Sequence, residues 1–270
     1  MKLAIISDIH ANLEALTATL ADISARGADR IVCLGDIVGY NANPAECVAL
    51  LREFDPVCVA GNHDRAVAGV IATDGFPHTA MRAVKWTRNH LDADALDYLA
   101  LLPLTAHVED QLVAVHGALH PPTGQDMVRL DSEQARRASF EALARHPSRA
   151  RILAFGHTHH VGIFELKHGA MRERRGDKVF LHDDAYYLVN PGAVGQSRTA
   201  DMRATYLVLD TEHQAVTVNR VAYDADAAAL KTRRAGLMPA FSFLPAPVRD
   251  TLKRGVRAVG LSDVVKRLAG

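Results

Sequence analysis

Five short polar clusters contain the residue types that bind metal ions in proteins. They are residues 7–10 (SDIH), 35–36 (GD), 61–64 (GNHD), 116–117 (HG) and 156–159 (GHTH). Imidazole nitrogens mixed with carboxylate and amide oxygens favour Mn, Fe, Ni, Co or Zn, whereas Ca²⁺ and Mg²⁺ prefer nearly all-oxygen shells. The clusters therefore predict a transition-metal site, provided that the chain brings them together.

Each cluster follows a short apolar run that is typical of a buried β-strand. The runs are residues 2–7, 31–34, 57–60, 112–115 and 152–155. Continuously apolar strands belong in a sheet that is covered on both faces. In a parallel α/β sheet the carboxyl ends of the strands lie along one edge. We therefore expect the five clusters to converge on one crevice, although they are far apart in the sequence.

Helical segments separate the first strands. Asn12 is a suitable N-cap for a helix with leucines at three- and four-residue steps, which Gly27 is expected to end. Residues 44–53 predict a second helix, so the chain begins with a βαβαβ alternation. Residues 78–102 also read as helical, with a second start signal at Asp92.

The second half of the chain predicts strands with almost no helix between them. Residues 187–189, 205–209 and 215–221 are the expected strands. The Gly- and Arg-rich stretch at 168–177 predicts an exposed loop. The fold is therefore expected to be α/β, with a strand-rich layer added to the first sheet.

The motifs D-x-H, G-D, G-N-H-D, H-G and G-H-T-H occur in this order from Asp8 to His159 and resemble the calcineurin-like metallophosphoesterase superfamily. The contexts GDIVGYNANPAECV, GNHDRAV and VNPGAVGQSR are similar to a bacterial branch of small YfcE-like phosphodiesterases. The resemblance implies a four-layer α-β-β-α sandwich with the metal site at the carboxyl ends of the strands. It also implies a phosphoesterase with two divalent transition metal ions, manganese first, with Fe, Ni, Co or Zn as alternatives.

The resemblance assigns three ligands to each ion and one carboxylate, Asp36, to both. A metal-bound hydroxide would then attack phosphorus in line. One ion is assigned to Asp8, His10 and His159, and the other to Asn62, His116 and His157. We prefer His116 to His107 and His120 because it alone directly ends an apolar strand and precedes glycine.

Three further residues receive roles from the resemblance. His63 would protonate the leaving oxygen, and Asp64 would orient the His63 ring. Arg198 belongs to a stretch that lies near the metals in the resembled branch, so it is a candidate phosphate contact. Residues 70–102 are a possible helical cap over the site, and their aromatic side chains are expected in the core rather than as a substrate platform.

Composition places limits on partners and location. Lys+Arg and Asp+Glu balance at 31 each, so no nucleic-acid partner is expected. Residues 1–223 are interpreted as the metallophosphoesterase domain, and residues 224–270 as a basic helical extension that packs on its own domain or on a partner subunit. Three scattered cysteines and the lack of a leader or transmembrane pattern predict a cytoplasmic protein, and a homo-oligomer stays open.

Charge favours a phosphodiester among the candidate substrates. Two carboxylates against two divalent ions leave a charge of about +2, which one hydroxide and one phosphodiester would neutralise. A small or nucleotide-like diester is therefore expected, and a phosphomonoesterase or phosphoprotein phosphatase is the alternative. A non-catalytic metal-binding scaffold is a third candidate, although every ligand position is intact.

Overall fold

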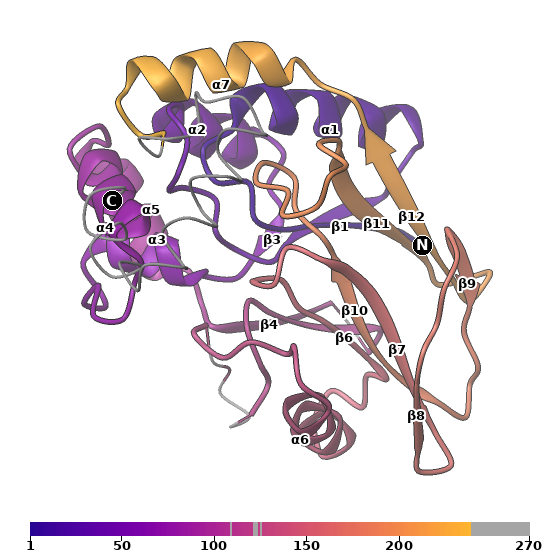
Figure 1. Ribbon diagram of the computed structural model, residues 1–270. Helices are drawn as coiled ribbons and strands as arrows, with labels where there is room; N and C mark the ends of the chain where they lie inside the picture. The colour runs from indigo at the N-terminus through magenta and orange to yellow at the C-terminus, as the bar shows by residue number, and fades with distance from the viewer. Residues whose placement is uncertain (109, 121–123, 125, 239–270) are drawn as a thin grey trace, which may run out of the picture.

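The computed structural model describes residues 1–108, 110–120, 124 and 126–238. Within these residues, two six-stranded β-sheets pack face to face, and helices cover the outer face of each sheet (Figure 1). The predicted four-layer α-β-β-α sandwich is confirmed.

The first sheet contains the strands from both ends of the described chain. In spatial order its strands are β3 (Val57–Cys58), β2 (Arg30–Cys33), β1 (Lys2–Ile6), β11 (Ala204–Asp210), β12 (Ala215–Val221) and β9 (Lys178–Phe180). The β1–β2 and β2–β3 pairs are parallel, whereas β1–β11, β11–β12 and β12–β9 are antiparallel.

The second sheet comes from the middle of the chain. Its strands, in spatial order, are β4 (Thr105–Val108), β5 (Leu112–Val115), β6 (Ile152–Ala154), β10 (Tyr186–Pro191), β7 (Val161–Lys167) and β8 (Ala170–Glu173). The expectation of a loop at 168–177 is wrong in part, because β8 pairs with β7 as a hairpin there. Exposed polar residues and a turn at Gly169 hid this edge strand in the sequence.

Helices form the two outer layers and one end of the molecule. α1 (Leu13–Ala25), α2 (Pro44–Glu53) and α7 (Ala225–Arg234) lie over the first sheet, and α6 (Glu133–Ala144) lies over the second (Figure 1). α3 (Asn62–Ala68), α4 (His78–Arg88) and α5 (Ala93–Leu101) pack together at one end. Asn12 and Asp92 cap α1 and α5 as predicted, and α7 lies in the segment predicted as a basic helical extension, whereas α3 and α6 were not predicted.

Alternate residues of the central strands serve different layers of the core. In β1, Leu3 and Ile5 pack between the two sheets, while Ala4 and Ile6 face the helices. All four are fully buried. This double coverage explains why the strand is continuously apolar rather than alternating.

The sequence suggested that the five clusters follow the strands of one parallel sheet. The structure instead divides these strands between two sheets. β1, β2 and β3 belong to the first sheet, and β5 and β6 belong to the second. Each set is internally parallel, so its carboxyl ends lie on one edge. Because the sheets are stacked, the two edges meet, and the predicted convergence occurs across the sandwich.

The described chain ends against the helical group. Arg82 of α4 donates from Nη2 to the carbonyls of Leu237 and Met238 at 3.2 and 3.0 Å. The amphipathic pattern predicted at 248–259 lies outside the described residues, and the division at residue 223 stays a prediction. No helix in the described part of the chain combines the length and apolar character needed to cross a bilayer.

The docking of α6 offers a test of this architecture. Phe140 on α6 is fully buried against the second sheet. Phe140→Ala should therefore lower the free energy of unfolding by about 3–5 kcal/mol. Arg137→Ala on the exposed face of the same helix should change it by less than about 0.5 kcal/mol. Urea unfolding followed by circular dichroism measures both values, and similar losses in the two variants would contradict the α6 packing.

Candidate metal centre

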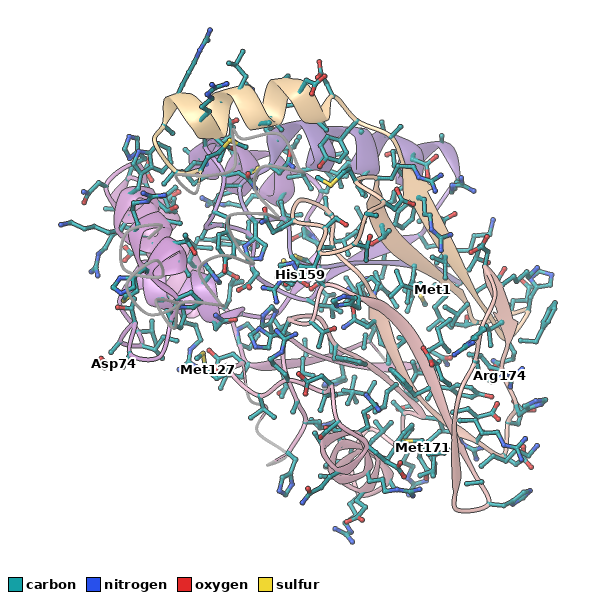
Figure 2. The ribbon with its side chains drawn as sticks, in the orientation of Figure 1. Met1, Asp74, Met127, His159, Met171 and Arg174 are labelled. Carbon is teal, nitrogen blue, oxygen red and sulfur yellow. The ribbon has the colours of Figure 1, made fainter. Side chains whose placement is uncertain are left out.

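All seven predicted ligand side chains meet where the two sheet edges join. His157 is half-buried and the others are buried. Figure 2 shows His159 near the centre of the molecule, between the sheets and the helices α3–α5. They include two sets of potential ligands, Asp8–His10–His159 and Asp36–His116–His157, and a third set, His10–Asp36–His63, connects these two.

The first group consists of Asp8, His10 and His159. Asp8 Oδ1 lies 3.2 Å from His159 Nε2 and 3.8 Å from His10 Nε2. The two imidazole Nε2 atoms lie 3.3 Å apart. Three potential ligand atoms thus surround one point, as the sequence predicted for one ion.

The second group contains Asn62, His116 and His157. His116 Nε2 lies 3.2 Å from Asn62 Oδ1 and 3.2 Å from His157 Nδ1. Asn62 is the first residue of α3, whereas the two histidines follow strands of the second sheet. The two sheets therefore contribute jointly to this group.

Asp36 stands between the groups. Its Oδ2 lies 3.6 Å from His10 Nε2 and 3.3 Å from His116 Nε2. Its Oδ1 accepts a hydrogen bond from the backbone N–H of His63 at 2.9 Å. One oxygen is thus held by the backbone while the other faces both groups, which is the arrangement that a bridging ligand requires.

Backbone carbonyls set the tautomers of three imidazoles. The Nδ1 atoms of His10, His116 and His159 face the carbonyls of Val38, Leu34 and Gln196 at 3.2, 2.7 and 2.6 Å. A nitrogen that faces a carbonyl must carry the proton, so Nε2 is an acceptor whenever the ring is neutral. This orientation of a ligand ring by an outer hydrogen bond is usual in metal sites.

The resulting cluster contains acceptors that face one another without donors. Asp8 Oδ1 has no hydrogen-bond partner among the described residues, and the bare Nε2 atoms of His10 and His159 point at each other. Burial lowers the pKa of both histidines, despite the opposing charges of Asp36 and Asp8. Their Nε2 atoms therefore carry no proton at neutral pH. The donor set therefore fits a divalent transition cation.

Protonation behaves differently in the second group. Burial opposes a charge on His116, but the adjacent Asp36 carboxylate outweighs burial and raises the pKa of His116 to about 10. Burial, with the charge of His116, lowers the pKa of His157 to about 3. A proton on His116 thus occupies the place that a cation would take in the metal-bound protein.

The ligands are presented by a strained backbone. Five of the seven have φ in the left-handed region: Asp8 (55°), His10 (48°), Asp36 (52°), His157 (63°) and His159 (59°). Such conformations cost on the order of 1 kcal/mol or more each and cluster at functional sites. They turn the chain after β1, β2 and β6, where the side chains of these residues come together.

Two glycines allow the strand ends to approach closely. A Cβ atom at Gly61 would lie 2.1 Å from Asp36 Oδ1, and one at Gly156 would lie 2.0 Å from Ser7 Oγ. Neither neighbour can move without displacing a ligand loop. This contact explains why glycine precedes the ligand in both the G-N-H-D and the G-H-T-H motifs.

His63 lies beside the two groups. Its ring is 4.9 Å from the His10 ring and 4.6 Å from the Tyr40 ring, between centroids. Its Nδ1 is buried and has no hydrogen-bond partner among the described residues. Burial lowers the pKa of His63, so burial favours the neutral form of its ring.

The expected role of Asp64 as the residue that orients His63 is wrong. Asp64 Oδ1 accepts from the Val38 N–H at 3.1 Å, and Oδ2 accepts from the Gly61 N–H at 3.0 Å. Neighbouring helical residues point in different directions, so the carboxylate turns away from the imidazole. Asp64 instead caps α3 and ties it to the loop after β2.

A pocket of about 260 Å³ opens onto both ligand groups. Arg198 lines it, in line with its predicted position, and so do Tyr40 and Arg129, which sequence reasoning missed. Tyr40 follows a glycine within the motif around Asp36, which could have indicated it, whereas no pattern marked Arg129. Phe76 is buried in the core, as expected of the aromatic residues, but it also forms part of the pocket wall.

Comparison with known proteins identifies the family. A model of the calcineurin-like phosphoesterase superfamily domain matches residues 1–214. The uncharacterized protein MJ0912 of Methanocaldococcus jannaschii is 35% identical over 234 residues, 82% of this chain and 88% of that protein. A metallophosphoesterase from Sphaerobacter thermophilus has 34% identity and a TM-score of 0.72, covering 87% of this chain and 95% of its own.

A less similar structure shares the fold. Protein PH1004 from Pyrococcus horikoshii has 18% identity and a TM-score of 0.69 over 93% of this chain and 97% of its own. The phosphoesterase YfcE from E. coli is also among the matches, with 21% identity and a TM-score of 0.40 over 82% of this chain and 100% of its own. The family match spans all five polar clusters. This chain belongs to the calcineurin-like phosphoesterase superfamily.

Proposed function

We propose that this chain is a phosphodiesterase that works with two divalent transition metal ions. The observation that carries the proposal is the position of Asp36 Oδ2, a buried carboxylate oxygen that faces two separate groups of acceptor atoms. A single shared anion between two cation-binding groups is what a dinuclear centre needs.

The ligand sets are proposed as the sequence predicted them. Asp8, His10 and His159 would hold one ion, Asn62, His116 and His157 the other, and Asp36 both. When bound, the ions would supply an activated water and positive charge for the phosphoryl oxygens. The mixed nitrogen and oxygen ligands favour manganese, with Fe, Ni, Co or Zn as alternatives.

His63 is proposed as the proton donor to the leaving oxygen. Its side chain lines the pocket, and its Nδ1 is not engaged by another described residue. Asp36 holds the backbone of His63, so the ring has a fixed approach to the pocket. A positioned acid of this kind typically contributes about 10² to 10⁴ in rate.

A diester is preferred as substrate because it leaves the centre close to neutral, whereas a dianionic monoester adds one further negative charge. A pocket of about 260 Å³ suits a small or nucleotide-like molecule. Phosphomonoester hydrolysis is the alternative activity of the same site. A non-catalytic scaffold is disfavoured because all seven ligand positions keep metal-binding side chains.

Location and assembly are also proposals. Cys33, Cys47 and Cys58 are free thiols, which supports a reducing, cytoplasmic environment. The balanced charge supports a partner other than nucleic acid. A homo-oligomer is compatible with this reading.

Metal removal tests the mechanism most directly. Prolonged chelation should abolish hydrolysis of bis(p-nitrophenyl) phosphate, and Mn²⁺ should restore it, because the nucleophile and the charge for the phosphoryl oxygens both depend on the ions. Release of p-nitrophenolate measures the activity, with circular dichroism as the control for folding. Full activity in a protein shown by elemental analysis to be metal-free would refute the proposal.

The bridging role of Asp36 predicts a difference between two variants. Asp36→Ala should lower the content of both ions, whereas Asp8→Ala should deplete one, because only Asp36 Oδ2 faces both groups. Mass spectrometry of the intact protein under non-denaturing conditions counts the ions per chain. Loss of a single ion from each variant would rule out the bridge.

The role of His63 predicts a dependence on the leaving group. His63→Ala should keep both ions and lose about 10² to 10⁴ in kcat with alkyl phosphodiesters, whose alkoxide leaving group needs a proton. With p-nitrophenyl esters the loss should be much smaller, because p-nitrophenolate leaves without a proton. Steady-state kinetics with both substrate types, together with metal content, distinguish the possibilities. Equal losses for the two leaving groups would make His63 a positioning residue instead.

A further inference from the structure

Two arginines line the pocket, one beside each ligand group. Arg129 is half-buried and donates from Nη1 to the carbonyl of His157 at 3.1 Å. Its Nε donates to Asp131 Oδ2, also at 3.1 Å. These two contacts fix the guanidinium on the side of the second ligand group.

Arg198 lines the same pocket. It follows Gln196, whose carbonyl accepts the hydrogen bond from His159 Nδ1 at 2.6 Å, so the loop that orients a ligand of the first group also carries this arginine. Arg198 forms no ion pair with the described carboxylates. Burial raises the pKa of the Tyr40 hydroxyl, and the nearby guanidinium of Arg198 acts in the opposite direction. Its charge is directed at the pocket.

The charges of the pocket exceed what one phosphodiester needs. Two divalent ions would bring four positive charges, and Asp8 and Asp36 bring two negative ones. One water-derived anion and one singly charged diester would bring the total charge to zero. The two arginines add +2, and Asp131 offsets only one of these charges while its own side chain is 61% exposed to water. Guanidinium groups bind phosphate through paired, charge-assisted hydrogen bonds, which makes phosphate oxygens their natural partner here.

We infer that the substrate carries at least one further phosphate beside the phosphorus that is attacked, and that Arg129 and Arg198 bind it. This inference rests on the proposed phosphodiesterase function and narrows its substrate to esters of diphosphate or longer polyphosphate. In such a molecule the attacked phosphorus is still substituted on two sides, which agrees with the preference for a diester. The apolar wall formed by Phe76, Pro77 and Met127 leaves room for the organic group.

The reaction requires no further reactant. Water adds its oxygen to phosphorus, the bridging P–O bond breaks with its electron pair on the departing phosphate, and the proton of the water passes to solvent or to that phosphate. The products are two phosphate monoesters from a diester of diphosphate, and from a longer chain at least one product keeps more than one phosphate. The binding step differs from that of a simple diester only through the oxygens of the second phosphate.

The test compares two substrates that share their nucleosides. P1,P2-di(adenosine-5′) diphosphate contains two phosphates, and adenylyl-(3′→5′)-adenosine contains one. Because a phosphate leaves more readily than an alkoxide in any enzyme, the informative quantity is the change in the ratio of kcat/KM between variant and wild type. Chromatography of the products from the Mn²⁺-loaded full chain gives both constants.

Arg129→Met and Arg198→Met should each lower this ratio by about tenfold to a hundredfold, the usual effect of losing one charged hydrogen bond. Arg129→Lys should recover part of the loss, because the charge remains while the paired geometry is lost. Arg145→Met, which removes an exposed arginine at the end of α6, should leave the ratio unchanged.

Ligand binding gives a readout that is independent of turnover. Calorimetry should give tighter binding of adenosine 5′-(α,β-methylene)diphosphate than of adenosine 5′-monophosphate to wild type, and this preference should fall in both methionine variants. An unchanged ratio and an unchanged binding preference in both variants would overturn the inference while leaving phosphodiester hydrolysis intact. A metal-loaded wild type that hydrolyses neither adenosine substrate nor bis(p-nitrophenyl) phosphate would instead refute the proposed function.

Discussion

The burial of the Asp36 carboxylate between two groups of imidazoles is the interaction on which the site depends. Burial alone would raise the pKa of Asp36, but His116, His63 and His10 lower it well below its usual value, so it stays ionised. A buried anion is unfavourable unless positive charge is present nearby. The fold therefore holds, at its centre, an arrangement that a bound cation stabilises, and the loops around it have to resist rearranging into a neutral one.

Backbone hydrogen bonds between the loops supply that resistance. The N–H groups of Asp8 and His10 donate to the carbonyls of Gly35 and Asp36 at 3.1 and 2.8 Å, which ties the loop after β1 to the loop after β2. The N–H of Gly156 donates to the carbonyl of His116 at 2.8 Å and does the same for the second sheet. Backbone conformations in the left-handed region are unfavourable by themselves. Hydrogen bonds to the neighbouring loops stabilise them here. The strained conformations of these loops are therefore maintained by the rigid sheets to which the loops are attached.

The sequence predicted which polar side chains come together better than it predicted the architecture that presents them. Asp8 and His157 were recognisable because each follows an apolar strand, and any fold that aligns the ends of such strands brings them together. Their separation into two sheets was not readable, since a strand buried on both faces has the same composition in either sheet. Arg129 belongs to a segment without periodicity, so only the three-dimensional contact with His157 reveals its place. The role of Asp64 was taken from the family resemblance, and the structure instead directs its carboxylate to the backbone N–H groups of Val38 and Gly61.

Hydrogen-bond donors and acceptors lie in different parts of the pocket. The carboxylate and imidazole side chains of the ligand groups present acceptor atoms to the pocket, whereas Arg129 and Arg198, which also line it, present positively charged donors. Without cations, an anion would be repelled from the ligand groups and attracted to the arginines. With cations bound to the ligand groups, the same anion is attracted from both places, and a molecule with two separated negative groups can satisfy both at once. Metal binding would therefore change where in the pocket an anion binds. The position of a bound phosphate would depend both on the metal ions and on the two arginines.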